Sequence, residues 1–276
     1  MRKLGENLSM IGIIIATIIK DKRNLELLIK SIGKCQNEYR CLIINQNNNS
    51  QLDINERNVK LLNVNFKNNS EAKNLGIDYF QDKSYVKFIW FLDDDCFVYN
   101  KDLKKLYKKI INSQNKLHNI FILQIINYNN INVGVKIHNL GIFNFFYLFR
   151  IGGPSLIIKK NIITSKFNKL LGPGTKFRSS EDIDFHLANF NFRVKYLKNI
   201  LIYHPTEIIN ENKIVRYSYG QGYMFQKLNL IKKVFFLILS FSRPIIGFIC
   251  FYFFNTIKKR MYKRRIVAFI RGFMKY

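Results

Sequence analysis

YVKFIWFLDDDCF, residues 85–97, joins a continuous apolar run to three consecutive carboxylates, Asp93, Asp94 and Asp95. A fully buried parallel strand has such an apolar run, and ligands of open α/β sheets gather at the carboxyl ends of the strands. Three adjacent acids repel one another at neutral pH and therefore favour a bound cation. Because alternate side chains of an extended chain point the same way, Asp93 and Asp95 can share one ion while Asp94 faces elsewhere.

Strand-like and helix-like stretches alternate on both sides of this segment. We expect further strands over 11–17, 40–45, 59–64, 120–126 and 155–158, and two short strands over 193–197 and 201–204. Helices are expected over 24–32, 70–80 and 100–110 and from Glu181 onward, and residues 127–144 are expected to form an Asn-rich excursion over the site. This alternation predicts an α/β fold with a mostly parallel sheet flanked by helices.

Length and cysteine usage narrow the class of protein. A chain of 276 residues can hold one large α/β domain with an appendage. The four cysteines show neither paired nor zinc-finger spacing, which indicates ordinary thiols in a reducing compartment. The apolar run 10–19 leads into charged residues instead of a small-residue cleavage site, so we interpret it as a core strand and not as a signal peptide.

The charge distribution separates the end of the chain from the rest. The net charge of +27 makes nucleic acid the first partner to consider, although abundant Lys, Asn and Ile indicate that part of it is compositional. No acidic residue follows Glu211, whereas the last 65 residues hold fourteen Lys and Arg among many aliphatic and aromatic side chains. Bulky aliphatic runs have no use on a phosphate backbone, so we expect an anionic membrane surface and no nucleic acid.

We therefore divide the chain into a catalytic domain, 1–210, and a basic, aromatic-rich, helical membrane-associating tail, 211–276. Two apolar pieces of the tail, 234–242 and 245–254, are each short of the roughly 20 residues of a spanning helix. A single membrane span made of both pieces would place Arg243 at the bilayer centre, which costs about 3 kcal/mol of insertion free energy. We expect amphipathic helices in the interface, with 258–265 on anionic headgroups; the alternative is a pair of buried helices packed on the core.

Five segments in a fixed order carry a family resemblance. They are residues 11–32, NNSEAKNLGI (68–77), FLDDDC (91–96), GGPS (152–155) and SSEDIDF (179–185), followed by His204. Together they resemble the inverting family 2 glycosyltransferases, over about residues 12–204. The resemblance implies the GT-A or nucleotide-diphospho-sugar transferase fold, which is Rossmann-like. It also implies sugar transfer from a nucleoside-diphosphate donor to a glycan or lipid-linked acceptor in cell-surface polysaccharide assembly.

The resemblance assigns the reacting groups. Asp93, Asp95 and His204 correspond to ligands of Mg²⁺ or Mn²⁺, with Asp95 the most direct. Asp182 corresponds to the catalytic base that takes the proton of the acceptor hydroxyl, and Glu181 to a residue that orients the acceptor. Without the resemblance, a lone His at a strand end and acids in the first turn of a helix are as well explained by structure alone.

The donor and acceptor contacts are implied less directly. Donor contacts correspond to Thr17, Asn45, Lys73, Asn74, Asp93 and Asp94, and acceptor contacts to Gly152, Gly153 and Glu181. Only Thr17 remains of the family's first-strand ending, and Asn45 and Lys73 stand where the family commonly has Asp and Arg, so the base of the nucleotide stays open. RYSYGQGY, 216–223, resembles members at the cytoplasmic, inner face of the cell membrane.

Two other functions remain as alternatives. A nucleotidyltransferase of the same fold needs a Gly-rich triphosphate loop after the first strand, and residues 17–22 contain no glycine. A non-enzymatic basic protein that binds membrane or nucleic acid gives the acid triplet and SSEDID no role, and acids are unfavourable at a phosphate-binding surface.

Overall fold

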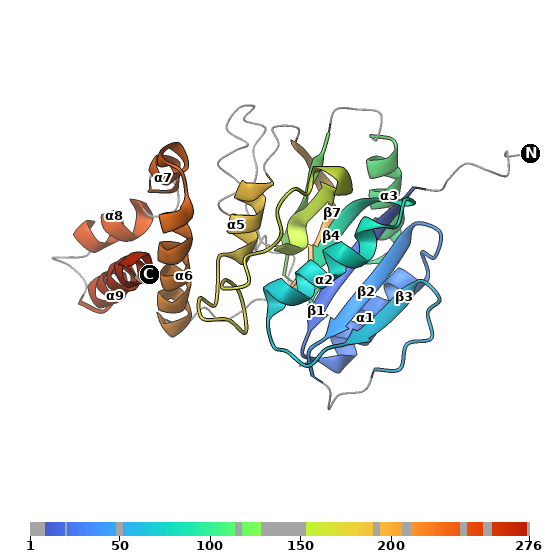
Figure 1. Ribbon diagram of the computed structural model, residues 1–276, viewed down its shortest axis with the longest axis horizontal. Coiled ribbons are helices and arrows are strands. Elements are labelled where there is room, and N and C mark those ends of the chain that lie inside the picture. The colour runs from blue at the N-terminus through green and yellow to red at the C-terminus, as the bar shows by residue number, and fades with distance from the viewer. Residues whose placement is uncertain are drawn as a thin grey trace, which may run out of the picture.

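The computed structural model describes residues 9–19, 21–47, 52–113, 118–127, 153–189, 194–205, 211–237, 242–250 and 256–274. Within them a seven-stranded sheet has the order β3-β2-β1-β4-β6-β5-β7 (Figure 1). Its strands are β1 (Met10–Thr17), β2 (Tyr39–Asn45), β3 (Val59–Asn63), β4 (Val86–Leu92), β5 (Ile120–Ile126), β6 (Leu156–Lys159) and β7 (Val194–Tyr203). Strand β6 is antiparallel to β4 and β5, and the other neighbours are parallel. The predicted mostly parallel sheet is confirmed.

Helices cover both faces of the sheet because their apolar side chains recur at helical spacing. Helices α1 (Lys22–Gly33) and α3 (Asn100–Ile111) pack on one face, through Leu25, Leu28, Ile29, Ile32, Leu103, Leu106 and Ile110. Helices α2 (Asn69–Gln81) and α5 (Glu181–Ala188) pack on the other, through Ala72, Ile77, Phe80 and Phe185. Strand β4 is central, with six of its seven residues buried between these layers, and so fixes where the following carboxylates emerge.

The prediction of two short strands near residue 200 is wrong. Residues 194–203 form one strand, β7, whose pairing with β5 continues across a register shift between Leu123 and Gln124. The polar residues 198–199 suggest a turn in the sequence, but a bulge accommodates them without ending the strand. Lys105 of α3 donates to the Asn199 carbonyl at 3.0 Å, which satisfies a group that the bulge exposes.

In the part of the chain that the structure describes, four helices follow the sheet: α6 (Glu211–Lys227), α7 (Leu230–Phe236), α8 (Ser242–Cys250) and α9 (Thr256–Met274). They lie together at the end of the molecule remote from α3 (Figure 1). Helix α6 joins them to the rest, because Tyr223 and Met224 share an apolar cluster with Leu171 and Phe177 and the Tyr223 and Phe177 rings stack at 3.9 Å. The expected helical nature of the tail is confirmed, and residues 238–241 and 251–255 of its apolar pieces lie outside the described residues.

Helices α7 and α8 expose much of their apolar surface. Large exposed side chains are Leu230, Ile231 and Val234 of α7 and Ile245, Ile246 and Ile249 of α8. On its other side α8 packs on α9, where Gly247 lies against the Tyr262 ring. This exposure speaks against two helices buried on the core. None of the described helices is both long enough and apolar enough to cross a bilayer.

Candidate active site

The predicted site residues gather at the sheet edge where the parallel strands end. Thr17 is the last residue of β1, Asp93 follows β4 and His204 follows β7. Because β6 runs antiparallel, its beginning lies at the same edge, and Gly153 comes shortly before it. This is the edge at which open α/β sheets bind their ligands.

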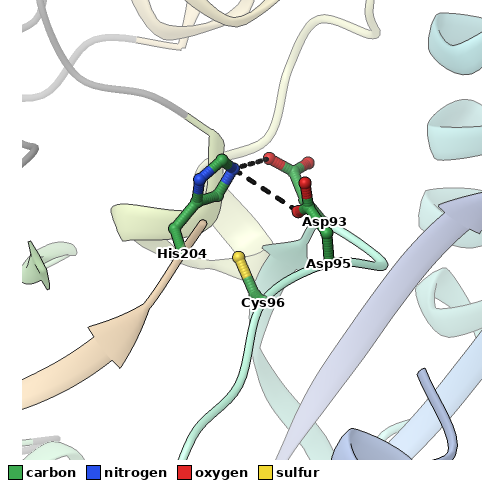
Figure 2. Close-up of side chains that lie close together, drawn as sticks. All are labelled: Asp93, Asp95, Cys96 and His204. Atoms are coloured by element: carbon green, nitrogen blue, oxygen red, sulfur yellow. Dashed lines mark ion pairs between the residues drawn. The ribbon is translucent and has the colours of Figure 1, made fainter. Parts of the chain in front are cut away.

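Four potential metal ligands lie close together at this edge. The ligand atoms of Asp93, Asp95, Cys96 and His204 are all within 4.8 Å of one another. His204 Nε2 is 3.9 Å from Asp93 Oδ2 and 3.4 Å from Asp95 Oδ1, and Figure 2 shows the imidazole facing both carboxylates. Asp95 Oδ1 is buried and has no hydrogen-bond partner among the described residues. A buried oxygen without a donor suits a cation, so these residues fit the predicted metal.

The His204 ring is oriented for this role by its other nitrogen. Nδ1 lies 2.8 Å from the backbone oxygen of Pro205. With Nδ1–H donating to that carbonyl, Nε2 keeps the lone pair that a metal ligand requires. The residue that directly follows β7 is therefore suited to bind a metal through Nε2.

Asp94 lies outside the metal-ligand group, as predicted, but not for the predicted reason: the triplet forms a turn, in which the Cys96 N–H donates to the Asp93 carbonyl at 3.2 Å, and is not extended. Its Oδ2 accepts a hydrogen bond from Thr17 Oγ1 at 2.5 Å. Thr17 Oγ1 in turn accepts from the Ile19 backbone N–H at 2.7 Å, and Ile19 has a φ of 52°. A β-branched residue rarely adopts this conformation, so the Asp94–Thr17 pair holds a strained turn directly after β1.

Lys73 lies at the centre of a second buried group. Its Nζ donates to Asp182 Oδ1 at 2.8 Å and lies 3.9 Å from Glu181 Oε1, with 4% of its side chain exposed. The Gly153 backbone N–H donates to Asp182 Oδ2 at 2.9 Å, and a Cβ on Gly153 would come within 2.9 Å of that oxygen. Both oxygens of Asp182 are therefore fixed, and glycine is needed at 153 for this approach.

The electrostatics of this group follow from burial and from mutual attraction. Burial raises the pKa of Asp182, but the Lys73 and His186 charges and the two hydrogen bonds outweigh it, so the pKa lies below its ordinary value. Burial and the Asp182 charge raise the pKa of Glu181 to about 7. Burial lowers the pKa of Lys73, yet the charges of Asp182, Glu181 and Asp93 raise it overall. Lys73 is therefore an ammonium ion that holds Asp182 ionised.

Helix α2 also holds the segment that leads to α5. Asn74 Nδ2 donates to the Phe167 carbonyl at 2.9 Å, and the Phe167 N–H donates to Asn74 Oδ1 at 2.8 Å. Ser70 Oγ donates to the Leu171 carbonyl at 2.6 Å, and Asn68 Nδ2 donates to the Lys169 carbonyl at 2.9 Å. The motif NNSEAKNLGI thus aligns residues 167–171 while it supplies Lys73.

Helix α5 begins from a strained residue. Ser180, the residue before Glu181, has a φ of 71° and makes no side-chain cap hydrogen bond. This conformation is uncommon outside glycine and persists where the surroundings over-determine it. Here the surroundings are the α2 contacts before it and the Lys73–Asp182 pair after it.

Not all predicted donor and acceptor residues point into the site. The Asn74 side chain is used by the Phe167 backbone, and the Asn45 amide donates to Asn63 Oδ1 at 2.9 Å. Their donor contacts stay predictions, as do those of Thr17 and Lys73, which pair with other site residues. Gly152 lies outside the described residues.

Two residues of the site were not predicted. Cys96 is fully buried and adds a thiol to the metal-ligand group, although it directly follows the recognised triplet. Tyr217 of α6 interacts electrostatically with the site, because burial and the charges of Glu181 and Asp93 raise the pKa of its hydroxyl. No sequence signal connects Tyr217 with this edge, because α6 is outside the alternating strands and helices.

Known proteins resemble the chain in fold and not in sequence. No protein family and no curated protein matches it by sequence. The crystal structure of S. aureus TarS gives a TM-score of 0.61 at 13% identity and covers 95% of this chain, which spans about half of TarS, 49%. The structure of TarS 1–349 in complex with UDP-GlcNAc gives a TM-score of 0.62 at 15% identity, and the match covers 95% of this chain and 81% of that one. The complex of TarS 1–349 with UDP gives a TM-score of 0.61 at 15% identity, and the match covers 95% of this chain and 80% of that one. The predicted GT-A fold is confirmed.

The buried Lys73 pair predicts an asymmetric response to charge removal. Lys73→Met leaves two buried carboxylates without their cation and should destabilise the protein by about 3–5 kcal/mol at neutral pH. Lys166→Met is the matched control, because its exposed pair with Asp78 has a similar N–O distance of 2.7 Å and should contribute less than about 1 kcal/mol. Urea unfolding measures both, and equal losses would contradict the central role of Lys73.

Glu181 predicts a pH dependence of stability. Its folded pKa of about 7 exceeds the unfolded value of about 4.3, so the folded state keeps a proton that the unfolded state releases. The associated stability is present below about pH 4.3 and is lost as pH rises to about 7. Glutamine does not titrate, so the Glu181→Gln variant does not lose this stability. The free energy of unfolding of the variant should therefore rise relative to that of the unchanged protein as pH increases from about 4.3 to about 7. A pH-independent difference in urea unfolding would contradict it.

Proposed function

We propose that the protein is a metal-dependent, inverting glycosyltransferase that uses a nucleoside-diphosphate sugar. The observation that carries the proposal is one sheet edge with two chemically different groups. Asp93, Asp95 and His204 form a cation site, and Asp182 is a separate carboxylate held ionised by Lys73. Support comes from the fold shared with TarS, which was solved with UDP and UDP-GlcNAc.

The first group suits the leaving-group side of the reaction. Negative charge grows on the diphosphate as the bond to the sugar breaks, and stabilising that charge accelerates the reaction. Asp93, Asp95 and His204, with Cys96 beside them, would hold Mg²⁺ or Mn²⁺. A bound divalent ion supplies this charge stabilisation. Asp94 follows the same strand, β4, and its partner Thr17 ends the neighbouring strand β1; both are proposed to contact the donor.

The second group suits the acceptor side. An acceptor hydroxyl that attacks opposite the leaving group needs a base to take its proton. Asp182 is ionised, and each of its oxygens keeps a lone pair after the bonds from Lys73 and Gly153. As the new C–O bond forms, the proton moves to Asp182 and the sugar–phosphate bond breaks. Glu181, Gly152 and Gly153 are proposed to orient the acceptor.

The remaining parts of the proposal concern location and acceptor. We propose residues 1–210 as the catalytic domain and 211–276 as a membrane-associating tail, peripheral on the inner, cytoplasmic face of the cell membrane. The exposed apolar side chains of α7 and α8 beside many basic residues support this placement. A glycan or lipid-linked acceptor in surface-polysaccharide assembly suits that location. Neither nucleotidyl transfer nor nucleic-acid binding is favoured by a described contact.

A thermal-shift experiment tests the donor half. UDP should raise Tm in the presence of Mn²⁺, because a ligand at 100 times its Kd stabilises by about 2.7 kcal/mol. Asp95→Ala should remove the metal-dependent part, while Asp78→Ala, which alters an exposed carboxylate of α2, should keep it. If no nucleoside diphosphate or its sugar shifts Tm with either metal, the proposed donor class is wrong.

A single carboxylate-to-amide change tests the base. Asp182→Asn should lower turnover by about 10²–10⁴-fold and leave the UDP response nearly intact, because the donor group is separate. Asp184→Asn changes a carboxylate two residues on in the same helix and should keep turnover. Retained turnover in Asp182→Asn would show that another group takes the proton.

A further inference from the structure

An open groove between α6 and α9 has no part in the function proposed above. Its volume is about 900 Å³, and its polar lining is cationic, from Arg216, Lys263, Arg264 and Arg271. Arg264 is partly neutralised, because it pairs with Glu211 at 2.7 Å and donates to Asn212. No carboxylate of the described chain pairs with Lys263 or Arg271, and the sequence has no acid after Glu211. The groove therefore favours an anion.

The rest of the groove lining is apolar. Val267, Ala268 and Met274 of α9 and Val215 of α6 stand beside the cations, and 67% of Met274 is exposed. A free phosphate or a nucleic-acid backbone gains nothing from such side chains, whereas a phosphate that carries acyl chains does. The exposed apolar residues of α7 and α8 belong to the same group of helices and extend the surface available to acyl chains (Figure 1).

The groove is fixed in shape by the contact between its two helices. A Cβ on Gly222 of α6 would lie 2.0 Å from the Phe269 carbonyl oxygen, and one on Gly272 of α9 would lie 2.0 Å from the Tyr219 carbonyl oxygen. The backbones touch at both glycines, and Arg265 Nε donates to Ser218 Oγ at 3.0 Å. A preformed groove spares a ligand the entropy of ordering its walls.

Helix α6 links this groove to the candidate active site. Val215, Arg216 and Tyr219 line the groove, whereas Tyr217 lies on the opposite side of the helix by helical spacing and interacts electrostatically with Glu181. Ser179 Oγ donates to the Tyr217 carbonyl at 3.0 Å, directly before the start of α5. One helix thus separates the basic groove from the acid-lined site.

We propose that the α6–α9 groove binds the phosphate headgroup of an anionic membrane phospholipid. Arg216, Lys263 and Arg271 contact the phosphate, and the acyl chains run over the exposed apolar side chains of the neighbouring helices. The inference deepens the membrane placement given under the proposed function and rests on it. It differs from a general attraction of a basic tail because it requires particular side chains.

Vesicle co-sedimentation of the full chain tests the proposal. Arg216→Gln/Arg271→Gln should weaken binding to phosphatidylglycerol–phosphatidylcholine vesicles by about 30-fold, because each basic charge near an anionic surface contributes roughly fivefold. Lys104→Gln/Lys108→Gln removes two exposed charges from α3, at the other end of the molecule, and should weaken binding less than about threefold. Equal losses in the two variants would reduce the groove to part of a diffuse charge effect and overturn the proposal.

A second measurement separates a lipid phosphate from a free anion. Dihexanoyl phosphatidylglycerol, below its micelle concentration, should raise Tm, inorganic phosphate at the same concentration should not, and Val267→Gln should weaken the lipid response. An equal response to inorganic phosphate would overturn the assignment to lipid. The Mn²⁺-dependent UDP response should survive in Arg216→Gln/Arg271→Gln, so loss of lipid binding and failure of the proposed transferase activity are read separately.

Discussion

The buried ammonium of Lys73 is the interaction on which the site depends. Its burial is tolerated because Asp182 and Glu181 surround it, and those carboxylates are in turn tolerated because of Lys73. The arrangement requires α2, α5 and the residues before β6 to lie within hydrogen-bond distance of one another, because the Gly153 N–H donates the second hydrogen bond to Asp182. Side chains of α2 and of Asn68 directly before it hydrogen-bond the backbone of residues 167–171, and these bonds hold the elements together from outside the charge cluster. The Lys73–Asp182 ion pair thus holds together α2, α5 and the residues before β6, which are distant from one another in the sequence.

Charge density at this sheet edge opposes folding, and the structure offsets it in two ways. Burial and the neighbouring carboxylates raise the pKa of Asp93 to about 6, whereas the Lys73 and His204 charges lower it. Asp94 instead turns to Thr17 and stabilises a turn with positive φ. Several carboxylates that repel one another at one sheet edge lower the stability of the fold, and such an arrangement is typical of a functional site. The charged groups at the candidate site therefore offset part of the stability that the apolar sheet provides.

The sequence predicted the parts of this arrangement that depend on local pattern. The apolar run before Asp93 identified β4, and helical spacing identified the positions of α1, α2 and α3 along the chain. Pairings between distant residues were not predictable in the same way. Lys73 meets Asp182 across 109 positions and Asn74 meets Phe167 across 93, and neither spacing leaves a periodic signal. The prediction of two strands in place of β7 was wrong because the local pattern was misleading. The polar residues in the middle of β7 are typical of a turn, but pairing with β5 keeps them in one strand with a bulge.

Helix α6 explains why a basic tail and an acidic site can coexist in one chain. Opposite charges at short range would pair and neutralise each other, as Arg264 and Glu211 do. The helix instead presents its basic groove on one side and Tyr217 on the other, and Gly220 allows close approach to Ser179 beside α5. Ser179 Oγ donates to the Tyr217 carbonyl at 3.0 Å, so the α6 backbone is bound directly to the residues before Glu181. The contact that keeps the two charged regions apart therefore also fixes the position of α6 relative to the start of α5.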